Sequence, residues 1–518
     1  MNICLVNPRG VSKSGVSIPH GLLQLAAELK AHGHEFAIVD FNNPDIPLEY
    51  EKLKRYDVVG LSVNTLQLAH AVEIAQSLGT SSRVIWGGIH CLLDPLSILN
   101  RFPKHFVVRG EGEIPLLNLA DYLDDRNNLD WLREQDGVCF MDGGKPIINK
   151  AFFNSNLDKL NDIDYYCLPE FERYLYSDLY YTTNRVSSLG ILVSRGCHWS
   201  CTFCINSLLA KHGGIYRTKS IEKIRRETEK IIDDFNIQFV NPSDEDFFLN
   251  KVLLKPWMQY AKEKGFFWAA NCRYNYFVDS IINKNRLSDL MDHGLFAIGM
   301  SIEAGDENIR NEILKKKVSD SHIENAIKII KDTVGDHLAV NTSFIVNFPG
   351  DTRDSRIKML KIMDRLSREI NITFSGPQAY RPYPGSELYE KGIKYKEGDL
   401  DFYIKGTAAS GALNAVLDNE TYFYTHVARV FFNSRFRFYR YSRAKDGRGY
   451  LAIDTSGKKT GIVRWLLAAV IKVLFIPVTI RLHTDYWRMF IEPLAVGWIA
   501  KKVERLINSP GKRSIIDT

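Results

Sequence analysis

Short apolar runs alternate with helix-like stretches through two long blocks of this chain, and the alternation constrains the fold more than any other feature. In the second block the apolar runs are residues 189–193, 238–240, 266–270, 296–301, 338–346 and 372–374. Strands that alternate with helices form parallel sheets, because each crossover helix carries the chain back to the same edge. The block therefore predicts an α/β barrel of six parallel strands.

The first block predicts a doubly wound, flavodoxin-like sheet within residues 1–150. Its expected strands are residues 2–8, 33–40, 57–63, 83–88 and 105–108, and its clearest helices are residues 20–32 and 66–78. Such sheets bind ligands beyond the carboxyl ends of their strands. Candidate ligand-binding residues at those ends are Ser62, Gly87, Gly88, Gly110, Glu111 and Gly112. Glycine there either lets a ligand approach the backbone or only makes a tight turn, and both interpretations stay open.

Three cysteines stand on one short loop after the first strand of the barrel block. Cys197, Cys201 and Cys204 are spaced by three and two residues. Thiolates bind iron-sulfur clusters, and a four-iron cluster on three cysteines keeps one iron open for a small molecule. The alternatives are three structural cysteines or a zinc site completed by a fourth ligand such as His198.

The cysteine spacing, with Phe203 before the last cysteine, resembles the cluster loop of the radical S-adenosylmethionine (SAM) superfamily. That resemblance implies a partial (β/α)6 barrel, a 4Fe-4S cluster, SAM bound to the open iron and a 5'-deoxyadenosyl radical. It also implies an electron donor such as flavodoxin or ferredoxin.

The resemblance extends to the loops that follow the later strands. It assigns Asp244 and Glu245 to the SAM amino group, Arg273 to the SAM carboxylate, and Ser301 and Glu303 to an element near the ribose or amino group. Residues 347–352 resemble the turn that opens the next helix, and residues 381–386 resemble the proline-glycine turn of the family. Lys315, Lys316 and Lys317 are expected to form a solvated charge run at a helix end.

The first block resembles the cobalamin-binding domains that precede some radical SAM barrels. The resemblance rests on residues 59–62, 87–90 and 110–113. The chain departs from one cobalamin pattern, because residues 1–150 contain no Asp-x-His-x-x-Gly that would supply a lower axial histidine. His20 and His90 are candidates only for lining the pocket.

Composition sets the expected compartment and partners. Eight cysteines in 518 residues do not form a secreted disulfide framework, and Met1 leads directly into a strand without a signal peptide. A cytoplasmic protein is therefore expected. A net charge of +6 does not by itself indicate nucleic acid.

Beyond residue 390 the resemblance weakens, and a mostly helical region is expected. Residues 425–448 mix arginines with aromatics, which favours packing on the barrel over binding of single-stranded nucleic acid. Residues 462–506 are too interrupted for a spanning helix. They predict either peripheral contact with the inner face of the membrane or a helical cap on the active site. The expected division is 1–150, a 151–185 linker, 186–390 and 391–518.

These resemblances imply a cobalamin-dependent radical SAM enzyme that methylates an unactivated carbon of a small or lipid-like substrate through the adenosyl radical and methylcobalamin. One alternative is a radical SAM cyclase or rearrangement enzyme without methyl transfer. Another is a membrane-associated, non-catalytic binding protein with a degenerate fold. The intact cysteine triplet argues against the latter.

Overall fold

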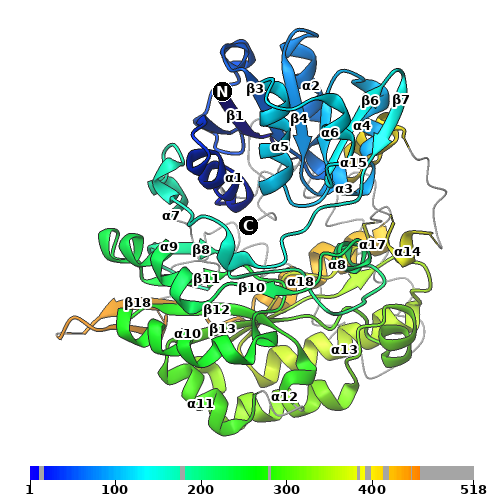
Figure 1. The fold of residues 1–518 in the computed structure, drawn as a ribbon. Coiled ribbons are helices and arrows are strands. Elements are labelled where there is room, and N and C mark those ends of the chain that lie inside the picture. The colour runs from blue at the N-terminus through cyan, green and yellow to red at the C-terminus, as the bar shows by residue number, and fades with distance from the viewer. Residues whose placement is uncertain are drawn as a thin grey trace.

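A computed structural model describes residues 1–10, 17–175, 181–277, 282–381, 385–390, 398–411, 419–444 and 446–455. It contains two large sheets, one above the other in Figure 1, each with its own covering helices. Residues 382–384 of the expected turn at 381–386, and the expected membrane segment at residues 462–506, lie outside these ranges. Within them no helix is both long and apolar enough to cross a membrane.

The N-terminal sheet has seven strands in the order β2-β1-β3-β4-β5-β6-β7. Its first five strands are parallel and follow the flavodoxin-like order. The strands are β1 (Asn2–Asn7), β2 (Glu35–Asp40), β3 (Val58–Ser62), β4 (Arg83–Gly87), β5 (Phe106–Val108), β6 (Val138–Asp142) and β7 (Lys145–Ile148). The antiparallel pair β6 and β7 is an addition that the apolar pattern did not predict.

Helices cover both faces of this sheet because its strands carry apolar residues on both sides. One face packs against α1 (His20–Ala31), α5 (Glu113–Leu123) and the short α6 (Leu129–Arg133). The other packs against α2 (Leu68–Leu78) and α4 (Pro95–Arg101), with α3 (Ile89–Leu93) just before α4. The carboxyl ends of β3, β4 and β5 are therefore not covered by either helix layer.

The second sheet has six parallel strands in the order β16-β14-β13-β12-β11-β8. This is the predicted partial barrel. Its strands are β8 (Ser188–Ile191), β11 (Phe239–Pro242), β12 (Phe267–Cys272), β13 (Leu295–Met300), β14 (Ala339–Thr342) and β16 (Ile372–Phe374). The helices between them are α8 (Ile205–Lys211), α9 (Ile221–Asp234), α10 (Lys251–Lys264), α11 (Lys284–Asp292), α12 (Asp320–Thr333) and α13 (Arg353–Glu369).

Local sequence signals set the ends of these helices. The Ser220 hydroxyl caps α9 by accepting from Lys223 N, and the Thr352 hydroxyl caps α13 by accepting from Ser355 N. Helix α10 ends at Gly265, which adopts a left-handed conformation with φ of 71°. The predicted turn at residues 347–352 does open a helix, as the sequence indicates.

One predicted strand, residues 338–346, is divided in two. Strand β14 ends at Thr342, and β15 (Ile345–Val346) pairs instead with β17 (Gln378–Ala379). The break arises because the Ser343 carbonyl accepts from Ile302 N and Glu303 N, which belong to the loop after β13. The chain is thereby bent at the carboxyl end of the barrel.

The region after residue 390 packs on both domains. Helix α15 (Leu400–Gly411) returns to the N-terminal domain, where Leu400 and Tyr403 join the core beside α2 and α4. The Asp94 carboxylate accepts from Gly398 N at 2.8 Å and from the Tyr403 hydroxyl at 3.1 Å. Helix α14 (Glu387–Glu390) precedes this return.

The arginine-rich aromatic segment packs against the barrel. It forms α17 (Asn419–Tyr422), a π-helical turn η9 (Phe423–Ala428), α18 (Arg429–Asn433) and the antiparallel hairpin β18 (Tyr439–Arg443) and β19 (Gly449–Ile453). Phe436 and Tyr439 pack with Phe239, Phe296 and Ala339. The hairpin, which the sequence analysis did not anticipate, lies beside β12 and β13 in Figure 1.

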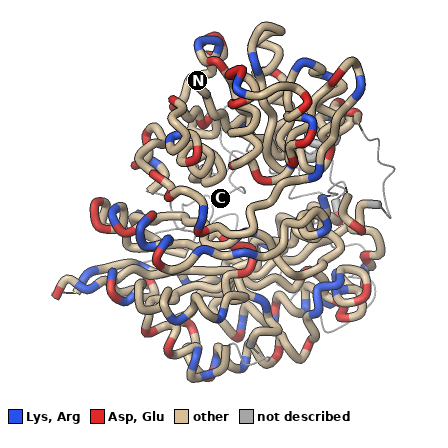
Figure 2. The backbone as a smooth tube through the Cα atoms, viewed as in Figure 1, with Lys and Arg blue, Asp and Glu red and all other residues tan. Residues whose placement is uncertain are grey.

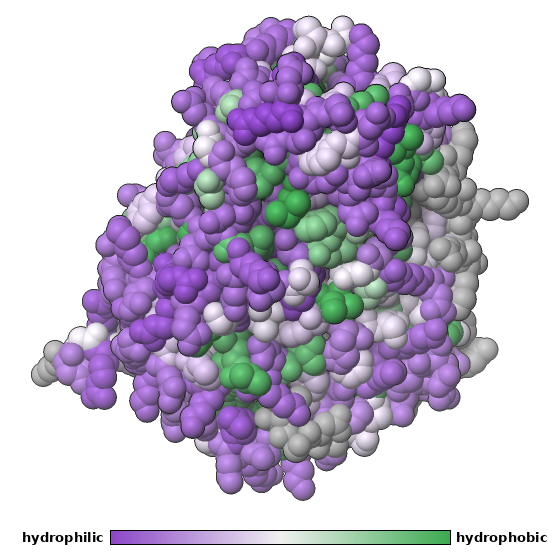
Figure 3. Space-filling model, viewed as in Figure 1, coloured by the Kyte–Doolittle hydropathy of each residue, from purple (hydrophilic) through white to green (hydrophobic). Residues whose placement is uncertain are grey.

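The surface is mixed in charge. Figure 2 shows Lys and Arg interspersed with Asp and Glu over the outer helices. The face in view in Figure 3 is mostly hydrophilic, with small, separate apolar patches. Exposed ion pairs such as Arg365 with Glu324 are worth little stability individually.

Candidate functional site

The three cysteines lie on the loop between β9 (Ser194–Arg195) and α8, at the carboxyl end of the barrel. Cys201 is buried, and Cys197 and Cys204 are partly exposed. Burial raises the pKa of Cys197 to about 11 and that of Cys204 to about 12. Binding of a metal cluster to these thiols would therefore release protons, since the thiolate is the ligand.

The cysteine loop is held by backbone contacts on both sides. Strand β9 pairs with β10 (Arg217–Thr218), so that Arg195 lies opposite Arg217. Gly196 has φ of 82°, and a Cβ added there would lie 2.6 Å from the Ile215 carbonyl oxygen. Only glycine fits this position. The close approach of the backbone at Gly196 thus sets the position of the next residue, Cys197.

The acidic segment after β11 divides into an accessible and a buried part. Glu245 lies on the wall of a cavity described below, and partial desolvation there raises its pKa. Asp244 is 1% exposed and accepts from Ser194 N. Burial raises the pKa of Asp244 to about 6. Among the described residues its Oδ2 has no hydrogen-bond partner, which suits a cationic ligand.

Arg273 follows β12 and is 7% exposed, as predicted for a buried-edge arginine. Its guanidinium Cζ lies 3.9 Å from the centroid of the Trp199 ring. One terminal nitrogen lies 3.9 Å from Cys201 Sγ, and the other donates to the Lys316 carbonyl. Arg273 therefore contacts the cysteine loop directly.

Glu303 and Ser301 lie where β13 ends. Glu303 adopts φ of 74° and forms an isolated bridge with Phe344. The Ser343 hydroxyl lies 3.0 Å from the Ser301 hydroxyl. Both predicted residues are thus tied to the bend after β14.

The expectation of a solvated Lys315 to Lys317 run is wrong for Lys316. Lys316 is 7% exposed, and its Nζ lies 2.9 Å from Glu303 Oε1. Lys315 pairs with Glu387 at 2.8 Å. Positive φ angles of 51° at Lys315 and 56° at Lys317 direct the chain through a tight loop instead of a helix end. A buried lysine needs a partner, and Glu303 supplies it.

The predicted cobalamin-binding residues lie at the carboxyl ends of the strands of the N-terminal sheet. Ser62 pairs in register with Gly87 at the ends of β3 and β4. Gly88 has φ of 92°, and a Cβ there would lie 2.6 Å from the Val63 carbonyl oxygen. Gly110 has φ of 102°, and a Cβ there would lie 2.2 Å from the Phe152 carbonyl oxygen. Gly112 caps α5.

Glu111 and the neighbouring Glu113 are held by arginines of the barrel. Arg217 lies 3.0 Å from Glu111, and Arg195 lies 2.7 Å from Glu113 and 3.4 Å from Glu111. The Asn154 side-chain amide donates to both carboxylates, at 3.0 Å and 2.9 Å. Sequence reasoning missed Arg195 although it lies only two residues before Cys197. It had no local signal for Arg217.

His20 and His90, the candidates for lining a cobalamin pocket, do not line the interdomain cavity described in the next paragraph. His20 Nε2 lies 2.9 Å from the Gly190 carbonyl oxygen, across the domain boundary. His90 is fully buried between Thr65, Ser97 and the Tyr403 ring. Burial lowers the pKa of each to about 4.

A cavity of about 280 Å³ lies between the two domains. It is lined from the N-terminal domain by Gly88, Gly110 and Glu111, and from the barrel by Ser194, Asn206 and Glu245 among others. Every one of these residues follows a strand or the cysteine loop. Of the predicted site residues, Gly88, Gly110, Glu111 and Glu245 line this cavity, whereas the three cysteines, Arg273, Ser301 and Glu303 are not part of its lining.

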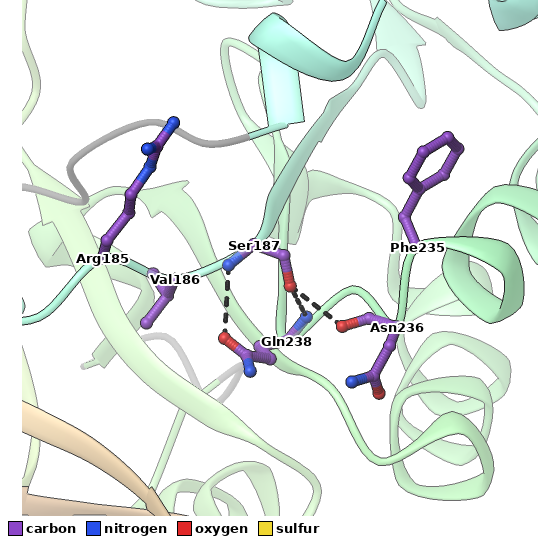
Figure 4. A pocket seen from close by; sticks show the side chains of 6 residues that line it. All are labelled: Arg185, Val186, Ser187, Phe235, Asn236 and Gln238. Atoms are coloured by element: carbon purple, nitrogen blue, oxygen red, sulfur yellow. Dashed lines mark hydrogen bonds between the residues drawn. The ribbon is translucent and has the colours of Figure 1, made fainter.

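A larger cavity of about 400 Å³ lies at the opposite end of the barrel, where β8 and β11 begin. Figure 4 shows its lining, in which the Ser187 hydroxyl donates to the Asn236 carbonyl and Ser187 N donates to the Gln238 side chain. Arg185, Val186 and Phe235 complete it. Parallel barrels bind ligands at the carboxyl ends of their strands, so the smaller interdomain cavity is the candidate active site.

The residues present fit the expected groups. Among the described residues no three His, Cys, Asp or Glu side chains converge on a single metal ion. Each cysteine of a four-iron cluster binds a different iron, so the three thiols need not converge on one point. Asp244 Oδ2, which has no hydrogen-bond partner in the part of the chain that the structure describes, and the accessible Glu245 supply negative charge for an amino group beside that cluster.

Comparison with known proteins agrees with this geometry. The Radical SAM superfamily model matches residues 191–363, and the B12 binding domain model matches residues 10–120. An uncharacterized methyltransferase of Pyrococcus horikoshii is 26% identical over 392 residues, which are 72% of this chain and 78% of that protein. The anaerobic magnesium-protoporphyrin IX monomethyl ester cyclase of Cereibacter sphaeroides is 23% identical over 424 residues, 76% of this chain and 63% of that protein.

A solved structure shares the fold. The radical S-adenosylmethionine methyltransferase TsrM from Kitasatospora setae, with cobalamin and a [4Fe-4S] cluster bound, superposes with a TM-score of 0.58 at 14% identity. The match covers 75% of this chain and 77% of TsrM. With its cysteine loop at the carboxyl end of a six-stranded partial barrel and a flavodoxin-like domain in front, the chain combines a radical SAM domain over residues 191–363 with a B12-binding domain over residues 10–120.

Proposed function

We propose that the protein is a cobalamin-dependent radical SAM methyltransferase that methylates an unactivated carbon of a small or lipid-like substrate. The interdomain cavity carries this proposal, because residues of the B12-binding domain and of the radical SAM domain line the same space. A methyl donor on one wall and a radical source on the other could reach one substrate only in such an arrangement.

The residue roles follow from position. Cys197, Cys201 and Cys204 would hold the 4Fe-4S cluster, and SAM would lie against Asp244, Glu245, Arg273, Ser301 and Glu303. The loops with Ser62, Gly87, Gly88, Gly110, Glu111 and Gly112 would cradle cobalamin. We propose the domain division 1–150, 151–185, 186–390 and 391–518 on the same basis, with a small electron-transfer protein as the reductant.

The chemistry would come from the cofactors: the cluster with SAM supplies a substrate-activating radical, and the corrinoid supplies the methyl group. The chain itself would bind, orient and exclude water. Glu245 faces the cavity and would orient the SAM ammonium. The buried neighbour Asp244 would add negative charge beside Glu245. The ion pairs of Arg195 and Arg217 with Glu111 and Glu113 would keep the two walls in register.

The proposal is tested by anaerobic reconstitution with iron, sulfide and cobalamin, followed by incubation with methyl-labelled SAM and cell extract. We expect absorption of both a cluster and a corrinoid, 5'-deoxyadenosine, and label in an extract component. Deoxyadenosine without any label transfer would contradict methyl transfer.

A cyclase or rearrangement activity is the second candidate, because the relative from Cereibacter sphaeroides is named a cyclase. Both activities need the same cluster and corrinoid, so the label decides between them. A colourless, iron-free protein after anaerobic purification would instead favour a non-catalytic binding protein.

Peripheral membrane contact through residues 462–506 is a separate proposal that rests on the sequence alone. Flotation with vesicles of anionic phospholipid would test it. The full chain should float, whereas a chain ending at residue 455 should remain at the bottom of the gradient.

A further inference from the structure

Arg273 has an unusual position for a residue that would only bind a substrate carboxylate. It is 7% exposed and directs one terminal nitrogen to Cys201 Sγ at 3.9 Å. Its other terminal nitrogen donates to the Lys316 carbonyl. Two of its donors are therefore already used on the cysteine loop and on the loop beside Glu303.

The Trp199 ring packs against the face of this guanidinium. The indole lies between Cys197 and Cys201 in sequence, and its ring centroid is 3.9 Å from Arg273 Cζ. Stacking on an aromatic face fixes the plane of a guanidinium and keeps its N–H groups at the edge. The edge that faces Cys201 is thus set by the packing of the cysteine loop itself.

Asp246 fixes the indole in turn. Its Oδ2 accepts from Trp199 Nε1 at 3.0 Å and from the Tyr276 hydroxyl at 2.6 Å. Asp246 is 1% exposed, and among the described residues its Oδ1 has no hydrogen-bond partner. One buried cation and one buried carboxylate therefore flank the same cysteine loop, and both act electrostatically on Cys197.

Reduction of an iron-sulfur cluster adds one negative charge to it. Positive charge and N–H donors directed at the ligand sulfurs stabilise the reduced state, whereas nearby negative charge opposes it. Burial strengthens both effects because little water screens them.

We propose that Arg273 and Asp246 form an opposed pair that sets the reduction potential of the cluster, Arg273 raising it and Asp246 lowering it. The inference rests on the cluster part of the proposed function and is independent of methyl transfer. Arg273 then acts on the cluster through Cys201 as a tuning residue, a role separate from the contact with SAM proposed above.

The test uses the full-length protein, anaerobically reconstituted with its cluster, in the absence of SAM. The electron paramagnetic resonance signal of the reduced cluster is followed while dithionite is added stepwise. We expect a more negative midpoint for Arg273→Gln and a more positive midpoint for Asp246→Asn. Arg273→Lys, which keeps the charge, should lie between wild type and Arg273→Gln.

Arg365→Gln is the matched control, because it removes the same charge from an exposed arginine on the outer helix α13. Its midpoint should equal that of wild type. Opposite shifts for the two buried variants cannot come from general disruption of the loop, which would move both in one direction.

Two results would overturn the proposal. One is an unchanged midpoint in Arg273→Gln together with a tenfold or greater loss of SAM affinity, which would make Arg273 a SAM-binding residue. The other is a shift of Asp246→Asn to more negative values, which also decides the matter if Arg273→Gln fails to fold. Failure of the wild-type protein to take up iron would be seen first and would contradict the proposed function itself.

Discussion

Arg195 Nη2 lies 2.7 Å from Glu113 Oε1, and this contact joins the residue two positions before Cys197 to the first turn of α5 in the other domain. The Glu113 side chain is 4% exposed and that of Arg195 15%. The radical SAM loop and the B12-binding domain are therefore locked together by buried charges.

Glu113→Gln should weaken this lock. Removing one partner of a buried ion pair costs about 3 to 5 kcal/mol, and the loss should lie at the lower end of that range because Arg195 keeps its 3.4 Å contact with Glu111. Denaturant unfolding should show a loss of this size. Asp121→Asn, which breaks the exposed pair with Arg126, should cost about 1 kcal/mol or less. Equal losses in the two variants would show that the interface pair carries no special weight.

Lys316→Met should destabilise the barrel by a similar amount, about 3 to 5 kcal/mol, because Glu303 would remain buried without its cation. The double variant with Glu303→Met should recover part of the loss. Lys315→Met is the control, since its partner Glu387 is much more exposed. A loss in Lys316→Met that the double variant does not reduce would argue against direct coupling.

Cys201→Ala should abolish the intact cluster and the formation of 5'-deoxyadenosine. Iron content and the visible spectrum report the first, and chromatography reports the second. Cobalamin binding should survive, because its predicted loops lie in the other domain. Cys167→Ala, in the linker, should keep full iron content. Undiminished SAM cleavage in Cys201→Ala would refute the cluster assignment.

Gly88→Ala should reduce cobalamin affinity at least tenfold. The added Cβ would lie 2.6 Å from the Val63 carbonyl oxygen, and φ of 92° strains any residue but glycine. Gly21→Ala is the matched control: it lies in α1 with nothing within 4 Å and should stabilise the helix by about 0.5 to 1 kcal/mol. Cobalamin affinity measured by spectral titration should separate the two, and equal affinities would place the corrinoid elsewhere.

Stability should fall as pH rises from about 4 to 6 through Asp244. Burial raises the pKa of Asp244 from 3.8 to about 6, so the folded state binds a proton more tightly than the unfolded state. The cost is absent below pH 4 and complete above pH 6, where it amounts to about 3 kcal/mol.

Asp244→Asn should therefore gain stability relative to wild type above pH 6 and lose this part of the pH dependence. Urea unfolding of both proteins between pH 4 and 8 measures the difference. SAM affinity of wild type should fall below pH 6, because the neutral carboxyl no longer attracts the ammonium. Identical pH profiles for the two proteins would mean that another group carries the dependence.

The sequence predicts those parts of the molecule that depend on local pattern. Strand β16 has the predicted bounds, because Ile372, Thr373 and Phe374 are all residues that favour strands. The cysteine loop is recognisable because all its ligands lie within eight residues. The β6 and β7 hairpin was missed although Asp142, Gly143 and Gly144 form a turn signal.

Residues whose roles depend on distant partners could not be predicted. Lys316 is buried only because its neighbours adopt left-handed angles and Glu303 lies opposite. Arg217 meets Glu111 across 106 positions of sequence. Neither pairing leaves a trace in local periodicity, and the solvated interpretation of the lysine run was accordingly wrong.

The return of α15 to the N-terminal domain has a consequence for synthesis on the ribosome. The Asp94 carboxylate accepts hydrogen bonds from Gly398 N and the Tyr403 hydroxyl. Leu400 packs into the core beside α2 and α4. Until that helix has been translated, Asp94 Oδ2 in the first domain to emerge lacks these two donors, and the apolar surface beside α2 and α4 is uncovered. The domain that is made first is therefore finished last, only after the whole barrel has followed it.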